Sequence, residues 1–228
     1  KSVANNLDTQ VKGVPIVFYN ASGFETTDIV SIEIEAPHFP KEVTVYDEQG
    51  KKVNSQLVSY TDGNVQLLVE ATVPAVGYVV YDVRLAGSEK EMAITEATNI
   101  ENSFYKLMLD ENGDIVSLFD KKNNKELVKA GKAIRLALFT ENESLSWPAW
   151  EVLKKTIDRT PISITSNVKM TLCENGELRK TLCVEKSHGG SFFRQYIHLY
   201  EGALAHRIDF INEIDWQSAN SLLKAEFP

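Results

Sequence analysis

The chain has 228 residues, of which 43% are hydrophobic and 25% are charged, a balance typical of a globular protein that buries a core. Its formal net charge is −8, with 32 Asp and Glu against 24 Lys and Arg, and the basic residues form no stripe. Negative charge repels phosphate backbones, so we expect no nucleic-acid partner. Apolar runs fall far short of the roughly 20 residues that cross a bilayer, so we expect no membrane partner.

The first residue is Lys1 and not Met, so we expect the chain to be part of a longer product. Residues 1–10 are compatible with a helix, and we predict a linker or helix tail over residues 1–12. The following segments alternate apolar and polar side chains, as half-buried strands do. Turn signals such as Asp62-Gly63 separate them at intervals of roughly 8–12 residues, which is typical of a small antiparallel sandwich. The predicted strands are residues 14–20, 29–35, 43–46, 52–60, 65–73 and 78–85.

This pattern predicts a β-sandwich over residues 13–86, followed by a polar linker over residues 87–98. A second β domain is predicted over residues 99–228. Asn112-Gly113 and Asn175-Gly176 are strong signals of two-residue hairpin turns within it, and residues 140–152 are expected to form a loop. The predicted strands are residues 104–109, 115–119, 134–139, 162–171, 178–184, 192–200 and 203–216.

The two cysteines, Cys173 and Cys183, flank the Asn175-Gly176 turn. If that turn has two residues, Cys173 faces Leu178 and Cys183 faces Val168. The two sulfurs then lie roughly 17 Å apart along the ladder. Because a disulfide needs Cα atoms within about 7 Å, we expect two thiols and no disulfide.

A second hairpin is predicted around Glu201-Gly202. It pairs Ile197 with His206 on an apolar face and Arg194 with Asp209 on a polar face. We therefore expect His206 to be a hydrogen-bonded histidine of the core.

The sequence contains little that resembles a catalytic or metal centre. The four histidines, His38, His188, His198 and His206, lack the His-x-Asp or His-x-x-x-His spacing of zinc sites, and two cysteines alone cannot complete one. Glycoside hydrolysis needs two positioned carboxylates, and none of the 32 acids stands out by spacing or apolar setting. We expect no catalytic residue, no metal ligand and no cofactor in this chain.

The best candidate for binding a substrate is the loop with Trp147, Trp150 and Glu151. Indole faces stack on the C–H surfaces of sugars, and a neighbouring carboxylate accepts hydrogen bonds from hydroxyl groups. The alternative is that Pro148 turns the chain and both indoles plug the end of the sandwich.

A second candidate is a polar and aromatic stripe that binds sugar or docks another domain. The alternative is an ordinary solvated sheet face. Asn20-Ala-Ser22 and Asn142-Glu-Ser144 also match the short glycosylation pattern, and we interpret both as chance matches. The residues of the stripe are Arg194, Tyr196, His198, Tyr200, Arg207 and Asp209.

Several segments, in this order, resemble the C-terminal β region of the family 38 α-mannosidases. The most specific is Ile-Asn-Glu-Ile-Asp-Trp at 211–216 together with Leu-Leu-Lys-Ala-Glu-Phe-Pro at 222–228. Trp-Pro-Ala-Trp-Glu at 147–151 resembles a Trp/Asp-Ala-Trp-Asp stretch of the family, with Glu151 where Asp is frequent. The other matching segments are residues 17–23, 73–78, 100–105, 112–113 and 117–120.

The resemblance implies an all-β fold, in which an immunoglobulin-like sandwich is followed by part of a galactose-mutarotase-like supersandwich. It also implies a zinc-dependent catalytic domain upstream in the same chain, whose zinc motif has no match here. The loop at 147–151 would then approach the catalytic cleft, and mannose-containing glycans would be the substrate. The isolated chain is expected to be inactive. Two other interpretations stay open, a freestanding carbohydrate-binding module and a purely structural pair of sandwiches.

The resemblance further implies that the second domain continues beyond Pro228. We therefore expect residues 192–216 to leave an apolar face exposed, or to cover it by forming a homo-oligomer.

Overall fold

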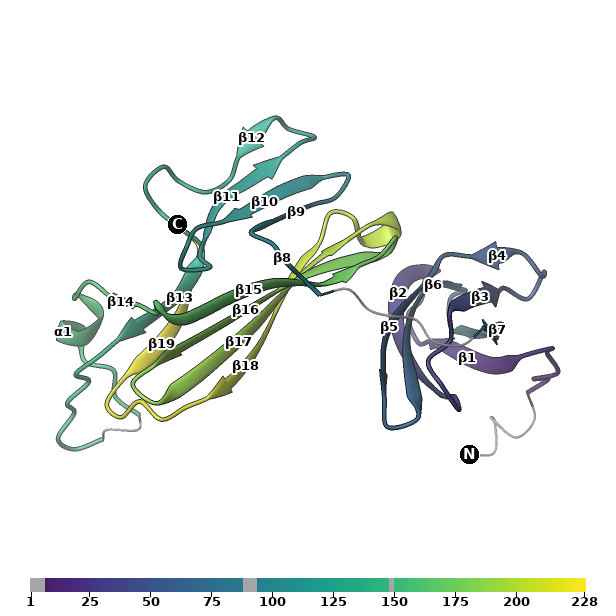
Figure 1. Ribbon diagram of the computed structural model, residues 1–228, viewed down its shortest axis with the longest axis horizontal. Helices are drawn as coiled ribbons and strands as arrows, with labels where there is room; N and C mark the ends of the chain where they lie inside the picture. Colours follow the sequence, from purple (N-terminus) through teal and green to yellow (C-terminus); the bar gives the residue numbers. More distant parts are fainter. Residues whose placement is uncertain (1–6, 88–93, 148–149) are drawn as a thin grey trace. The chain divides into compact units, whose positions relative to one another are not determined.

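The computed structural model describes residues 7–87, 94–147 and 150–228. The chain forms two compact units (Figure 1). The first comprises residues up to Ala93 together with the turns Gly176–Arg179 and Tyr200–Leu204. The second comprises Ile94–Asn175, Lys180–Leu199 and Ala205–Pro228. Both are built from antiparallel strands, which confirms the all-β fold class.

The first unit has two sheets. One has the order β1-β7-β3-β4, with β1 (Val14–Asn20), β7 (Gly77–Ala86), β3 (Glu42–Tyr46) and β4 (Lys52–Val53). The other has the order β2-β6-β5, with β2 (Thr26–Glu35), β6 (Asn64–Val73) and β5 (Ser55–Thr61). Of the segment predicted as a linker or helix tail, residues 1–6 lie outside the described part, and residues 7–10 are not helical, which leaves the linker alternative.

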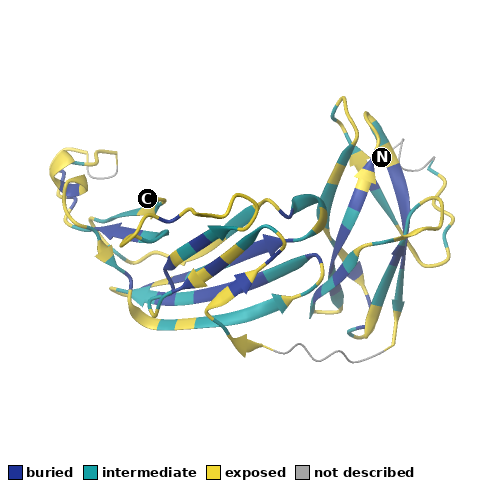
Figure 2. Ribbon diagram, turned by 90° about the horizontal axis from the view of Figure 1, so that it is seen from above, coloured by how far each residue is buried: buried dark blue, intermediate teal, exposed yellow. Residues whose placement is uncertain are grey.

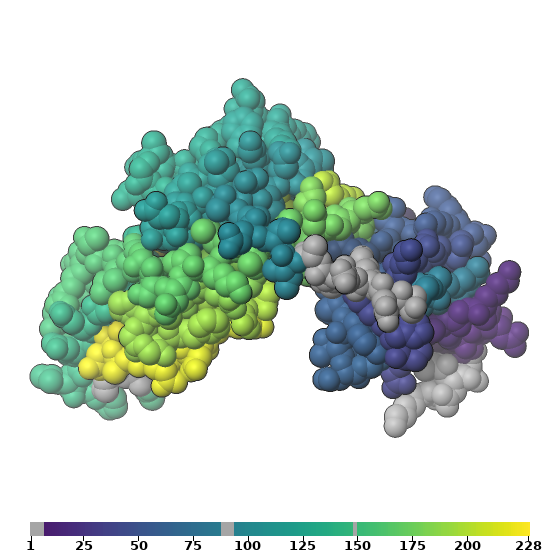
Figure 3. Space-filling view, viewed as in Figure 1, coloured from purple at the N-terminus to yellow at the C-terminus, as the bar shows by residue number. Residues whose placement is uncertain are grey.

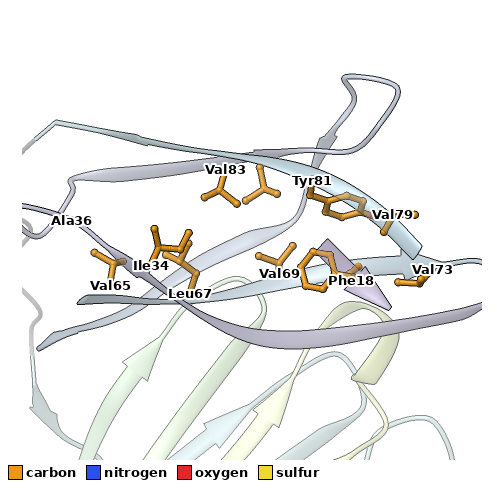
Figure 4. Packing of buried hydrophobic residues seen from close by; sticks show 12 residues of the cluster. Phe18, Ile34, Ala36, Val65, Leu67, Val69, Val73, Val79, Tyr81 and Val83 are labelled. Carbon is orange, nitrogen blue, oxygen red and sulfur yellow. The ribbon is translucent and has the colours of Figure 1, made fainter. Parts of the chain in front are cut away.

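The core of this unit follows from the alternation of side chains along β6. Val65, Leu67, Val69 and Val73 point between the sheets (Figure 4). Together with Ala71 they are at most 7% exposed. They meet Val79, Tyr81 and Val83 of β7, together with further residues of β1, β2 and β3. Each fully buried Val or Leu side chain contributes about 1.5–3 kcal/mol relative to exposure, so this layer dominates the stability of the unit.

Three sheets form the second unit. A four-stranded sheet has the order β12-β11-β10-β9, with β12 (Lys125–Glu126), β11 (Ile115–Asp120), β10 (Tyr105–Leu109) and β9 (Asn99–Glu101). A three-stranded sheet has the order β14-β13-β19, with β14 (Ile162–Ser163), β13 (Arg135–Phe139) and β19 (Leu222–Glu226). The five-stranded sheet has the order β18-β17-β16-β15-β8, with β18 (Ile208–Asp215), β17 (Ser191–Tyr200), β16 (Arg179–His188), β15 (Ser166–Asn175) and β8 (Thr95–Glu96). Strand β8 lies within the segment expected to be a linker.

The main core of this unit lies between the four-stranded and five-stranded sheets, and the atoms of the two segments lie against one another in the space-filling view (Figure 3). Leu107 and Ile115 from the first sheet meet Leu182, Ile197 and Leu199 from the second, and all five are at most 1% exposed. A smaller cluster of Leu138, Ile164 and Phe193 connects β13 to β17. No helix among the described residues has the length and apolarity needed to cross a membrane.

The cysteine hairpin has a different register from the one predicted. Asn175 pairs with Lys180, and Cys183 pairs with Thr171 and not with Val168, with an irregularity between Leu172 and Glu174. The turn is wider than two residues because Leu178 is buried in the first unit against Val58 and Leu68. The Gln56 amide accepts the N–H groups of Leu178 and Arg179 at 2.9 and 2.8 Å, which fixes the wider turn. Neither cysteine forms a disulfide, as expected.

The Glu201-Gly202 hairpin is shifted by four residues from the prediction. Ile197 pairs with Phe210 and Arg194 with Glu213, because residues 201–207 form a longer turn that includes a 3-10 helix at Gly202–Leu204. Glu70 accepts the Ala203 N–H at 2.8 Å and holds this turn. His206 is exposed in the turn and is not the predicted core histidine.

The expected exposed apolar face is present only in part. Phe193, Ile197 and Leu199 of β17 are buried, whereas Phe210 of β18 is half-buried and Ile214 is 41% exposed. Strand β18 is an edge of its sheet and has no buried residue, whereas nearly all residues of β17 are buried or half-buried (Figure 2). The exposed apolar residues of this region are Ile211 and Ile214 of β18, Phe192 of β17 and Trp216, at 37–50% exposure.

A buried ion pair in the second unit allows a stability prediction. Lys186 Nζ lies 2.5 Å from Asp114 Oδ1, and their side chains are 8% and 7% exposed. Burial raises the pKa of Asp114, against the opposing effect of its hydrogen bond from Lys186. Removing one partner leaves a buried charge, so we expect Lys186→Met to lower the free energy of unfolding by about 3–5 kcal/mol.

The control is the Lys154–Asp158 pair, which has a 2.6 Å contact but side chains 82% and 56% exposed. Lys154→Met should change stability by about 0.5 kcal/mol or less, since exposed i,i+4 pairs contribute little. Urea unfolding followed by circular dichroism measures both, and equal losses for the two variants would contradict the account.

Candidate functional site

The loop between β13 and the short helix α1 (Lys154–Ile157) carries the predicted site residues. Its two ends are held together by Asn142, which is only 7% exposed. The Asn142 amide donates to the Glu151 carbonyl at 2.8 Å and accepts the Leu153 N–H at 3.0 Å. Its backbone N–H also donates to the Asn220 carbonyl at 2.7 Å. Asn142 therefore closes the loop through its side chain and ties it to the body of the unit through its backbone N–H.

Within the loop, Ser144 fixes the position of Glu151 and Trp147. The Ser144 hydroxyl donates to Glu151 Oε2 at 2.6 Å and accepts the Trp147 N–H at 3.1 Å. The N–H groups of Trp150 and Glu151 both donate to the Trp147 carbonyl, at 3.0 and 2.9 Å. The backbone carrying the two indoles is thus set by local hydrogen bonds.

The structure brings the three predicted residues together at the surface. Trp147 and Trp150 are 63% and 86% exposed, and their ring centroids lie 6.0 Å apart with planes tilted by 30°. Glu151 is also exposed. Neither indole fills a core, so the interpretation as a plug is wrong for this chain, whereas a sugar-binding role stays a prediction. Pro148, invoked for the plug, lies outside the described residues.

The sequence analysis did not assign three further residues to this site, namely Asn142, Ser144 and Leu145. The Leu145 side chain is fully exposed beside the tryptophans in sequence, so the loop presents an apolar surface larger than the two rings. Asn142 and Ser144 had been noticed only as a glycosylation pattern. Both side chains are buried and hold the loop through hydrogen bonds. This agrees with the interpretation of the glycosylation pattern as a chance match.

The second candidate, the polar and aromatic stripe that begins at Arg194, is not an open surface. His198 and Tyr200 are buried, and His198 Nδ1 lies 2.7 Å from the Thr181 hydroxyl. Arg194 is held by Glu185 at 2.7 Å and Glu213 at 3.1 Å, which raise the pKa of its guanidinium. The predicted Arg194–Asp209 pair does not form, because the register shift places Asp209 opposite His198. Within residues 7–87, 94–147 and 150–228, no three His, Cys, Asp or Glu side chains are placed to share a metal ion.

The exposure of the indoles predicts how variants of the loop affect stability. Trp147→Ala and Trp150→Ala should each change the free energy of unfolding by about 0.5 kcal/mol or less, as surface substitutions do. Asn142→Ala should cost about 1–3 kcal/mol, because the Leu153 N–H loses its acceptor. Thermal and urea unfolding measure both, and a loss of several kcal/mol for either tryptophan variant would show that the indole is packed.

Comparison with known proteins agrees with the resemblance noted in the sequence. The family model described as the glycosyl hydrolases family 38 C-terminal domain matches residues 100–228. Alpha-mannosidase G of Dictyostelium discoideum is 27% identical over 234 aligned residues, which cover 92% of this chain and 20% of the relative. The chain thus spans about one fifth of the length of that relative. It belongs to glycoside hydrolase family 38, whose C-terminal domain it carries over residues 100–228.

Proposed function

We propose that this chain is the accessory β-sandwich region of a zinc-dependent enzyme that hydrolyses terminal α-mannosides. The family match over residues 100–228 carries this proposal, and the likeness to an α-mannosidase supports it. The zinc ion and the catalytic carboxylates belong to a catalytic domain elsewhere in the same polypeptide. The described residues of this chain do not supply a zinc ligand set, so no catalytic step is assigned to them.

The sandwiches scaffold the catalytic domain, and the loop with Trp147, Trp150 and Glu151 forms part of the wall of its cleft. Two exposed indoles 6.0 Å apart offer adjacent apolar faces to the C–H surfaces of a mannoside. The exposed Glu151 carboxylate accepts hydrogen bonds from sugar hydroxyls. Because Asn142 and Ser144 hold the loop, little conformational entropy is lost when it meets a ligand.

A second candidate function is a carbohydrate-binding module that needs no catalytic domain. The exposure of both indoles in the isolated chain favours it, because an aromatic platform is already formed without a partner. Binding of mannosides by the isolated chain, lost in Trp150→Ala, distinguishes this module from a purely structural role.

Self-association is the remaining partner proposal. The edge strand β18, with Ile211 and Ile214 50% and 41% exposed, offers both backbone groups and apolar side chains to a second copy.

Activity of the complete enzyme tests the proposed role of the loop. Trp147→Ala and Trp150→Ala should each lower kcat/KM on an aryl α-mannoside by about two- to tenfold, the loss of one stacking contact, while leaving stability unchanged. The isolated chain should show no hydrolysis and should retain no stoichiometric zinc after dialysis. Phe24→Ala is the control, since Phe24 is 68% exposed but lies in the other unit. Unchanged kcat/KM in both tryptophan variants would show that the loop does not contact the substrate in the cleft.

A further inference from the structure

The outer face of β7 carries a row of residues that the core does not use. Val79, Tyr81 and Val83 point into the core of the first unit, so the alternate residues of β7 point away from it. Those residues are Tyr78, Val80, Asp82 and Arg84, and all four line one groove of about 650 Å³. This volume lies within the range of about 300–1,000 Å³ that is usual for small-molecule sites.

Aromatic side chains stand at both ends of this row. Tyr19 of β1 lies directly opposite Tyr78 in the sheet, and their ring centroids are 6.1 Å apart with planes tilted by 46°. The two rings are 59% and 44% exposed. At the other end, Tyr46 of β3 lies opposite Asp82 and also lines the groove. Tyr78 and Asp82 are four residues apart, or about 13 Å along the strand, which is longer than one monosaccharide.

Polar groups between these rings are held in fixed positions. Arg84 donates two hydrogen bonds to Asp82 Oδ2, at 2.9 and 2.6 Å, and its guanidinium lies over the Tyr46 ring at 4.2 Å. The side chain of Arg84 is still 38% exposed, so it offers a pre-oriented donor at the groove surface. Glu48, an exposed acceptor on the same groove, is held by the Val80 N–H at 3.2 Å.

The second wall of the groove is anchored by Gly13. Its N–H donates to Asp82 Oδ1 at 2.7 Å, which places residues 8–12 along the groove. A Cβ at this position would lie 2.2 Å from the Val83 carbonyl, so only glycine permits the contact. Burial alone would raise the pKa of Asp82, but the hydrogen bonds from Arg84 and Gly13 outweigh it and lower the pKa. Asp82 therefore stays ionised and keeps both partners in place.

The charge of the lining restricts the class of ligand. Four carboxylates, those of Asp8, Asp47, Glu48 and Asp82, outnumber the two cations Lys12 and Arg84. Excess negative charge disfavours phosphorylated, sulfated or uronic ligands. Carboxylate acceptors, a fixed guanidinium donor and exposed tyrosine faces together suit the hydroxyl and C–H surfaces of an uncharged sugar chain.

We propose that the groove on the outer face of β7, with Tyr78 and its neighbour Tyr19 at one end and Tyr46 and Arg84 at the other, binds a neutral oligosaccharide. The site involves none of the residues of the Trp147–Glu151 loop, and it does not rest on the function proposed for that loop. It gives the first unit a way to hold the chain on a polysaccharide.

Affinity electrophoresis of the present chain tests this proposal, in native gels that contain soluble α-mannan, dextran or polygalacturonate. We expect retardation by at least one of the two neutral polymers and none by the anionic polygalacturonate. Tyr19→Ala and Tyr78→Ala should each weaken binding by about two- to tenfold, the loss of one stacking ring. Tyr78→Phe, which keeps the ring, should preserve binding and guards against a loss caused by misfolding.

Phe227→Ala is the matched control, an exposed aromatic of the other unit that belongs to neither proposed sugar site, and it should leave retardation unchanged. The proposal is overturned if neither neutral polymer retards the chain, or if polygalacturonate retards it more strongly. It is likewise overturned if the tyrosine variants bind as the parent does while Trp150→Ala abolishes binding. That last result would place all sugar binding on the tryptophan loop, so the two sites are distinguished within one experiment.

Discussion

One constraint shapes both units: each antiparallel sheet buries an apolar face against another sheet. The β2-β6-β5 sheet also buries part of its opposite face, where Leu68 meets Leu178. Successive side chains of a strand point to opposite faces, so Val65, Leu67 and Val69 of β6 enter the core together. The same constraint directs Ile197 and Leu199 of β17 into the main core of the second unit. The surfaces available for function are what this constraint leaves outside, namely the outer face of β7 and the loop that follows β13.

Side chains buried beside the turns determine how the strands are connected. Gln56 accepts two backbone N–H groups in the turn Gly176–Arg179, and Glu70 accepts one in the turn that contains Gly202. Asn142 has the same role in the tryptophan loop. A buried N–H without an acceptor costs about 1–3 kcal/mol, so each of these side chains strongly favours one turn geometry.

The strands were largely predictable from the sequence, whereas the registers were not. Residues 14–20 were predicted as a strand and form β1 with those bounds. The hairpin of β17 and β18 was predicted four residues out of register, yet Ile197 kept its inward direction because an even shift preserves the face. The register errors arose because Gln56 fixes the turn between β15 and β16, and Glu70 fixes the turn between β17 and β18. Both side chains are more than 100 residues from the turn that they hold. Local turn signals cannot contain that information.

The sequence identified the residues of the candidate site but did not show whether their side chains are exposed or buried. Trp147, Trp150 and Glu151 stood out because aromatic and acidic residues are close together in a turn-like segment, but the same pattern fits a buried plug. The sequence analysis did not recognise the tyrosines of the β7 groove, because each of them lies in a segment that reads as an ordinary strand. Only the register, which places Tyr19 opposite Tyr78, shows that they form a surface.

Trp147 and Trp150 are open in this chain, and we propose that they meet the sugar in the complete enzyme. Hydroxyl-radical footprinting with mass spectrometry tests it directly, because the labelling of each indole reports its access to solvent. The account predicts rapid labelling of both indoles in the isolated chain, at 63% and 86% exposure. It also predicts protection of at least one indole in the complete enzyme when a mannoside inhibitor is bound. Slow labelling in the isolated chain, or no protection by the inhibitor, would contradict the account.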